Sequence, residues 1–77
     1  MKTLTLSRNL LNPMVLPGMG RSIEVSGLTS ADNLEIRSEW QKGELYIEFD
    51  DEPGSSHRAI NLWPDPHDMS RLTLFIK

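Results

Sequence analysis

Two histidines lie near acidic residues in the second half of the chain, and such side chains are the usual ligands of metal ions. His57 follows the acidic stretch DDE at 50–52, and His67 lies within the segment WPDPHDMSR. The strand expected between them is about five residues long and spans roughly 17 Å, which separates the histidines. The chain lacks both the His-Glu-x-x-His spacing and the calcium-binding EF-hand loop. The sequence therefore predicts no metal site and no cofactor.

Nucleophilic catalysis is the second chemistry to consider. Ser55, Ser56 and His57 are adjacent in a polar loop, but adjacency alone does not orient a nucleophile, a base and a third supporting group. There is neither a Gly-x-Ser-x-Gly elbow nor a phosphate-binding glycine loop. We predict that the protein is not an enzyme and has no catalytic residue. A small metal-dependent hydrolase that uses His57 and His67 remains the third of three hypotheses.

Length and composition restrict the remaining classes. With 77 residues and no cysteine, the chain is expected to form a single domain, 1–77, without disulfides or thiolate chemistry. It has no apolar run of the 18 or so residues that cross a bilayer, and its start lacks the apolar core of a signal peptide. We therefore expect a cytoplasmic protein without membrane contact. A domain of this size buries only about 60% of its unfolded surface, which favours a partner or a homodimer.

The charge is unevenly distributed along the chain. The formal net charge is -3, but residues 24–52 contain nine acidic and only two basic side chains. An acidic middle segment argues against direct nucleic-acid binding, which needs a dense positive field. The alternative is a basic patch with Trp63 or Phe75 as a stacking platform for bases. Its members would be Arg8, Arg21, Arg58, Arg71 and Lys77.

Alternation of apolar and polar residues predicts strands in most of the chain. Six segments show it: 2–7, 21–27, 34–40, 44–50, 58–63 and 71–77. Polar or glycine- and proline-containing segments separate them, and a turn or single helical turn capped by Thr29 or Ser30 is expected before residue 34. The predicted fold class is all-β, as a small antiparallel sandwich or partly open barrel of about five to six short strands.

A hairpin over residues 34–50 is the most regular part of this pattern. Gly43 can supply the positive φ of a tight turn between the two strands. Leu34, Ile36 and Trp40 would face the core from the first strand. The second strand would contribute Leu45, Ile47 and Phe49. The opposite face would then carry a ladder dominated by acids.

Two further segments have more than one interpretation. Residues 10–19 are apolar and contain two prolines, so they either plug one end of the core or form an exposed arm that docks on another chain. The segment WPDPHDMSR is interpreted as a stiff turn in which Asp65 and Asp68 accept local backbone donors. His67 would lie at its exposed bend.

Protein binding is the function that these features favour. We expect a non-enzymatic domain that binds another protein stoichiometrically through an acidic surface and prefers a basic partner surface. An inhibitor of a host nucleic-acid-binding protein, such as phages and mobile elements encode, would act in this way. The alternative is a structural or assembly subunit of a homo-oligomer. The predicted partner-binding residues are Glu35, Glu39, Glu44, Tyr46, Glu48, Asp50, Asp51 and Phe75.

Overall fold

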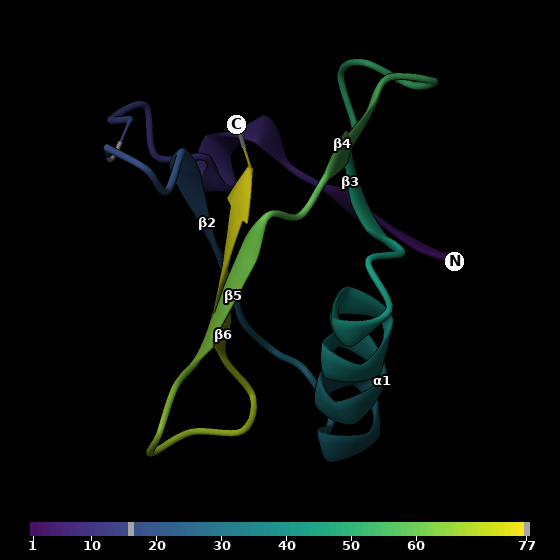
Figure 1. The fold of residues 1–77 in the computed structure, drawn as a ribbon, viewed down its shortest axis with the longest axis vertical. Helices are drawn as coiled ribbons and strands as arrows, with labels where there is room; N and C mark the ends of the chain where they lie inside the picture. The colour runs from purple at the N-terminus through teal and green to yellow at the C-terminus, as the bar shows by residue number, and fades with distance from the viewer. Residues whose placement is uncertain (16, 77) are drawn as a thin grey trace.

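The computed structural model describes residues 1–15 and 17–76, and strands predominate in this part of the chain. The predicted all-β fold class is confirmed in that the fold is largely β, although one α-helix accompanies the six strands among the described residues (Figure 1). No helix in this part of the chain has the length and apolar character of a membrane span. The elements are β1 (Lys2–Leu6), the 3-10 turn η1 (Arg8–Leu10), β2 (Arg21–Val25), α1 (Ser30–Gln41), β3 (Leu45–Phe49), β4 (Ser56–Arg58), β5 (Asn61–Pro64) and β6 (Leu72–Ile76).

The strands form two three-stranded sheets, in the orders β1-β3-β4 and β2-β6-β5. The sheets are joined where the chain passes from β4 to β5. The Ala59 N–H donates to the Leu45 carbonyl of the first sheet, and the next N–H, of Ile60, donates to the Phe75 carbonyl of the second. On the other side, Leu11 bridges to Ile23 of β2. The fold is therefore a compact arrangement of two small three-stranded sheets that are linked through residues 59 and 60.

The pairing of β1 with β3 is parallel, whereas the other strand pairs are antiparallel. The antiparallel prediction is therefore wrong for this one pair. Parallel neighbours need a long crossover connection. The connection from β1 to β3 is long enough because it includes β2 and α1.

Residues 34–40 belong to α1, so the predicted hairpin is wrong. The helix begins after Thr29, whose side chain accepts a hydrogen bond from the Asp32 N–H at 3.1 Å. Asn33 and Ile36 are buried and Trp40 is partly buried, so the inward face follows helical rather than strand spacing. The alternation of Leu34 and Ile36 was misleading, because Leu34 is exposed.

Gly43 ends this helix instead of turning a hairpin. Its φ is +74°, its N–H donates to the Trp40 carbonyl at 2.9 Å, and the Glu44 N–H donates to the Glu39 carbonyl at 3.0 Å. This pair of bonds is a Schellman motif, which uses glycine at the same positive φ that a hairpin turn needs. A glycine with positive φ is typical both of a hairpin turn and of a helix C-terminus, so Gly43 alone did not distinguish the two structures.

The core lies between the two sheets and beneath α1. The predicted inward residues of β2, β3 and β6 are all buried. Leu62 of β5 is buried, whereas Ile60, which precedes β5 where the chain changes sheets, is exposed. The main core comprises Ile23, Val25, Ile36, Leu45, Ile47, Phe49, Ala59, Leu62, Leu72, Leu74 and Ile76.

Candidate functional site

The outer face of the β2-β6-β5 sheet brings an exposed aromatic residue next to charged groups. Cross-strand register places Thr73 between Glu24 and Trp63 and places Phe75 two residues further along β6. Phe75 was predicted to be an outer-face anchor, but it is only 1% exposed. Its ring packs against Trp63 with the centroids 4.8 Å apart, and Trp63 itself remains 51% exposed. The exposed aromatic side chain on this face is therefore Trp63.

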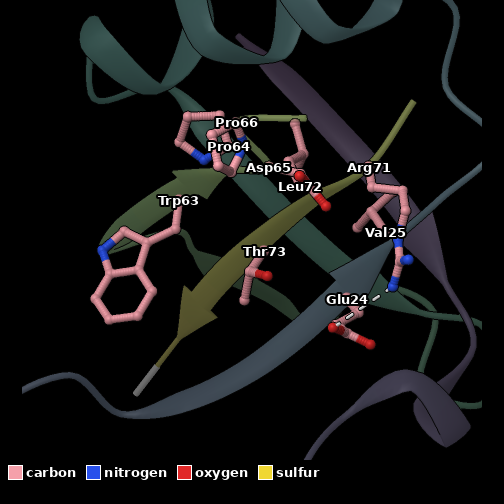
Figure 2. Close-up of a pocket in the computed structure, with 9 residues that line it drawn as sticks. All are labelled: Glu24, Val25, Trp63, Pro64, Asp65, Pro66, Arg71, Leu72 and Thr73. Atoms are coloured by element: carbon pink, nitrogen blue, oxygen red, sulfur yellow. Dashed lines mark ion pairs between the residues drawn. The ribbon is translucent and has the colours of Figure 1, made fainter. Parts of the chain in front are cut away.

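Two surface cavities lie on this face, with volumes of about 240 and 420 Å³. Because Glu24 and Thr73 line both, the cavities adjoin, and we call them together the sheet groove. Figure 2 shows the smaller cavity, with Trp63 on one side and the Glu24 and Arg71 side chains on the other. The first cavity is lined by Glu24, Val25, Trp63, Pro64, Asp65, Pro66, Arg71, Leu72 and Thr73, and the second by Asn9, Leu10, Leu11, Asn12, Pro13, Ser22, Glu24 and Thr73.

One wall of the sheet groove is the β5–β6 connection, which is the segment WPDPHDMSR. The Asp65 carboxylate accepts the His67 N–H at 2.9 Å, and the Asp68 carboxylate accepts the Ser70 N–H at 2.9 Å and the Ser70 hydroxyl at 2.6 Å. The predicted local turns are therefore confirmed. The Ser70 hydroxyl lowers the pKa of Asp68 below its ordinary value.

The same wall is attached to the helix. Asn33 of α1 is fully buried, and its side-chain amide donates to the Met69 carbonyl at 2.7 Å. Arg37, one turn further along α1, lies 3.9 Å from the Met69 sulfur. These contacts fix the position of the loop that carries Pro66 and Asp65. The segment WPDPHDMSR, whose residue types most resembled a reactive site, therefore forms a groove wall that contacts with α1 hold in place.

The opposite wall is formed by residues 9–13. The Asn12 N–H donates to the Ser22 carbonyl of β2 at 2.8 Å, and the Asn12 side chain accepts the Met14 N–H at 3.0 Å. Leu11 packs against the core, whereas Leu10, Met14 and Val15 are exposed. Segment 10–19 thus anchors one leucine against the core and exposes three apolar side chains, and its docking on another chain stays a prediction. Leu16 lies outside the described residues.

The charges in the groove are two carboxylates and one guanidinium. Arg71 lies 3.9 Å from the Glu24 carboxylate, and the two side chains are 51% and 73% exposed. Arg71 also contributes to the lowered pKa of Asp68, so its charge is shared between two acids. With Asp65 counted, the lining of the two cavities has a net charge of -1.

The predicted acidic ladder is divided into three groups, of which the first lies on and just after α1. Glu35 and Glu39 lie on α1, and Glu44 lies just before β3. The chain's own cations neutralise this group: the terminal amine of Met1 lies 3.5 Å from Glu39 and 3.4 Å from Glu44. In addition, Lys2 lies 3.1 Å from Glu35 and Lys42 lies 3.7 Å from Glu39.

The second group lies at the other end of β3. Arg8 contacts Asp51 at 2.8 Å and Glu52 at 3.1 Å, and its guanidinium lies 4.5 Å from the centre of the Phe49 ring. The hydrogen bond between Arg8 and Asp51 raises the pKa of Arg8 and lowers that of Asp51. Asp50 is exposed nearby in sequence.

Tyr46 and Glu48 point to the outer face of the β1-β3-β4 sheet. Both side chains are half-buried. Tyr46 lies between Thr3 and Arg58 in the strand register. The predicted interface residues therefore form three groups rather than one strip, and Phe75 is on the other sheet.

The histidines and arginines are also distributed over the molecule. His57 packs on Phe49, with the ring centroids 5.6 Å apart, whereas His67 is exposed in the β5–β6 connection. Within residues 1–15 and 17–76, no three His, Asp or Glu side chains are grouped so that they could hold a metal ion. Of the proposed basic patch, Arg8 and Arg71 are engaged with carboxylates, and Lys77 lies outside the described residues.

Sequence reasoning missed the groove because its members come from distant segments. Trp63 and Glu24 are far apart in the chain, and their proximity depends on the β2-β6-β5 order. Comparisons with protein-family models, curated proteins and solved structures found no match to this chain. The function is therefore inferred from the sheet groove and the residues beside it.

Proposed function

We propose that this chain is a small, non-enzymatic domain that binds another protein stoichiometrically through the sheet groove. The observation that carries the proposal is the position of exposed apolar side chains beside one groove. The exposed Trp63 lines one cavity, and the exposed Leu10 lines the other. The exposed Met14 and Val15 directly follow Pro13, which also lines the second cavity. Exposed apolar patches mark interaction sites, and tryptophan is enriched among the residues that dominate binding energy.

The hydrogen bonds that fix the two groove walls also support this proposal. Backbone and side-chain hydrogen bonds fix both loops beside the groove, so little conformational entropy is lost when a partner docks. The lack of cysteine is compatible with a cytoplasmic protein, and we include that compartment in the proposal.

A photo-crosslinking amino acid at Thr73, on the groove floor, tests the proposal in the cells that produce the protein. The matched control is the same amino acid at Thr5, an exposed strand threonine opposite Glu48 on the other sheet. We expect a cross-linked protein from Thr73 and not from Thr5. A second probe at the exposed Pro13 confirms the groove independently. Cross-linking absent from both groove positions would reject the proposed function.

A second candidate keeps the acidic-surface mechanism. Glu48, Asp50, Asp51 and Glu52 are close in sequence at the end of β3, and the ion pairs found there come from Arg8. Such a cluster would suit an inhibitor that occupies the phosphate site of a nucleic-acid-binding protein. Cross-linking from Thr5 alone, lost after Glu48→Lys and Asp50→Lys, would favour this candidate over the groove.

A further inference from the structure

We propose that the groove's occupant is an extended partner segment in which a lysine or arginine is flanked by bulky apolar residues. This inference rests on the proposed function, because it names the chemistry of the partner at the same site. It follows from three features: the net charge of the groove, the row of residues across its floor and the apolar walls on both sides.

The charge of the groove favours a cation. Glu24 is 73% exposed, and its ion pair with Arg71 is long, at 3.9 Å. The Arg71 side chain is itself 51% exposed, so solvent weakens its attraction for Glu24. Asp65 adds a second carboxylate to the lining. A cationic side chain would restore neutrality, whereas an acidic one would add repulsion.

The floor has a suitable receptor for that cation. Trp63, Thr73 and Glu24 lie side by side on three adjacent strands. Neighbouring strands are about 4.8 Å apart, so the backbones that carry Trp63 and Glu24 are separated by roughly 10 Å. A cation placed over Thr73 therefore has an indole ring on one side and a carboxylate on the other. Tryptophan is the best aromatic receptor for a lysine or arginine cation.

The two walls account for the apolar flanks. Pro64 and Pro66 lie on one side of the central row, and Leu10 and Pro13 lie on the other. Alternate side chains of an extended segment share one face, so a segment whose cation lies over Thr73 can place the apolar residues two positions before and after that cation in the two cavities. This arrangement joins a central charged contact with apolar contacts at both ends.

Titration of the isotope-labelled full chain with defined peptides, followed by amide NMR, tests this occupant. The probes are three acetylated, amidated pentapeptides: Leu-Ser-Arg-Ser-Leu (the Leu-Arg peptide), Leu-Ser-Glu-Ser-Leu (the Leu-Glu peptide) and Gly-Ser-Arg-Ser-Gly (the Gly-Arg peptide). We expect the Leu-Arg peptide to shift the amides of Glu24, Trp63 and Thr73 in a saturable manner. Glu24→Arg should weaken this binding at least tenfold, whereas Glu48→Arg, a charge reversal on the other sheet, should leave it unchanged.

Several outcomes would overturn the inference. Equal binding of the Leu-Glu peptide would show that the cation is not required. Equal binding of the Gly-Arg peptide would show that the apolar flanking residues are not required. Shifts confined to Asp50 and Asp51 would place the cation on the acidic cluster instead. Concentration-dependent shifts in the groove with a dimer mass by light scattering would make a second copy the occupant. If Thr73 cross-links to a protein but these peptides fail, the proposed function stands and only this inference fails.

Discussion

The two sheets have the same number of strands but very different outer faces. The β1-β3-β4 sheet presents alternating polar side chains, such as Thr3, Thr5 and Glu48. The β2-β6-β5 sheet also carries polar residues outward, but two connections rise beside it and form the walls of the sheet groove. The comparison shows that the loops, rather than the strands, make one face a candidate site.

The strongest test of this comparison concerns the shared core. Ile47 and Leu74 are fully buried in the central strands of the two sheets. Each substitution by alanine should lower the free energy of unfolding by about 2–5 kcal/mol, which is large for so small a domain. Denaturant unfolding followed by circular dichroism measures the loss, with the exposed Ile60→Ala as a control. If only one of the two buried substitutions has an effect, the sheets do not share one core.

The next largest effect concerns the loop that leads into β2 of the β2-β6-β5 sheet. Gly20 and Gly18 have φ values of +82° and +76°, so alanine at either position should cost about 1–2 kcal/mol. At Gly20 an added Cβ would also collide with the Ile76 carbonyl oxygen, whereas the space around Gly18 is open. Gly20→Ala should therefore lower the melting temperature more than Gly18→Ala. Equal losses would argue against this close approach between the loop and β6.

The aromatic residues of the two outer faces provide the third test. Trp63→Ala should weaken partner binding by about 2 kcal/mol or more, roughly thirtyfold, as expected of a central interface residue. Tyr46→Ala on the other sheet is the matched control and should leave binding unchanged. Titration calorimetry with the partner captured through Thr73 gives both values. The reverse result would move the interface to the β1-β3-β4 face.

The smallest expected effects are two local pKa changes. Asp68 and Asp51 both have a pKa below the ordinary value of 3.8. Ser70→Ala should raise the pKa of Asp68 alone, and Arg8→Ala should raise that of Asp51 alone. Carboxyl NMR titrations measure both values. A lack of change in either variant would mean that the corresponding hydrogen bond does not persist in solution.

The direction of the pH effect on stability follows from these shifts. A carboxyl group with a lower pKa in the folded chain than in the unfolded chain stabilises the fold above its unfolded-state pKa. That contribution is lost as the pH falls through the folded-state pKa. Both acids should therefore contribute to acid destabilisation below pH 3.8, and the two variants should reduce this pH dependence.

Sequence pattern predicted β1, β2, β3 and β6 to within two residues at each end, whereas the single strand predicted at 58–63 is divided between β4 and β5. Residues 45–49 alternate between buried and half-buried positions as expected. Residues 34–40 show a similar alternation in letters, yet they are helical because Thr29 caps the N-terminus and Asn33, Ile36 and Trp40 face inward at helical spacing. Both segments were compatible with the period-two pattern over a few residues, and the Thr29 cap together with the helical spacing of the inward residues distinguishes the helix.

The groove was less predictable than the strands. The turn-forming roles of Asp65 and Asp68 are local, so they could be inferred from neighbouring residues. The contact between the N-terminal loop and β2, by contrast, depends on which strands become neighbours. Charge pairing was hidden for the same reason, since the cations that neutralise the acidic middle of the chain come from Met1, Lys2 and Arg8.

The hydrogen bond from the buried Asn33 side chain to the Met69 carbonyl gives α1 an influence on a site that it does not line. The helix holds one groove wall in place, so a change on its inward side would alter the spacing of the walls while every lining residue stayed the same. In evolutionary terms, affinity could then drift through the helix, and a comparison restricted to groove residues would overlook the cause.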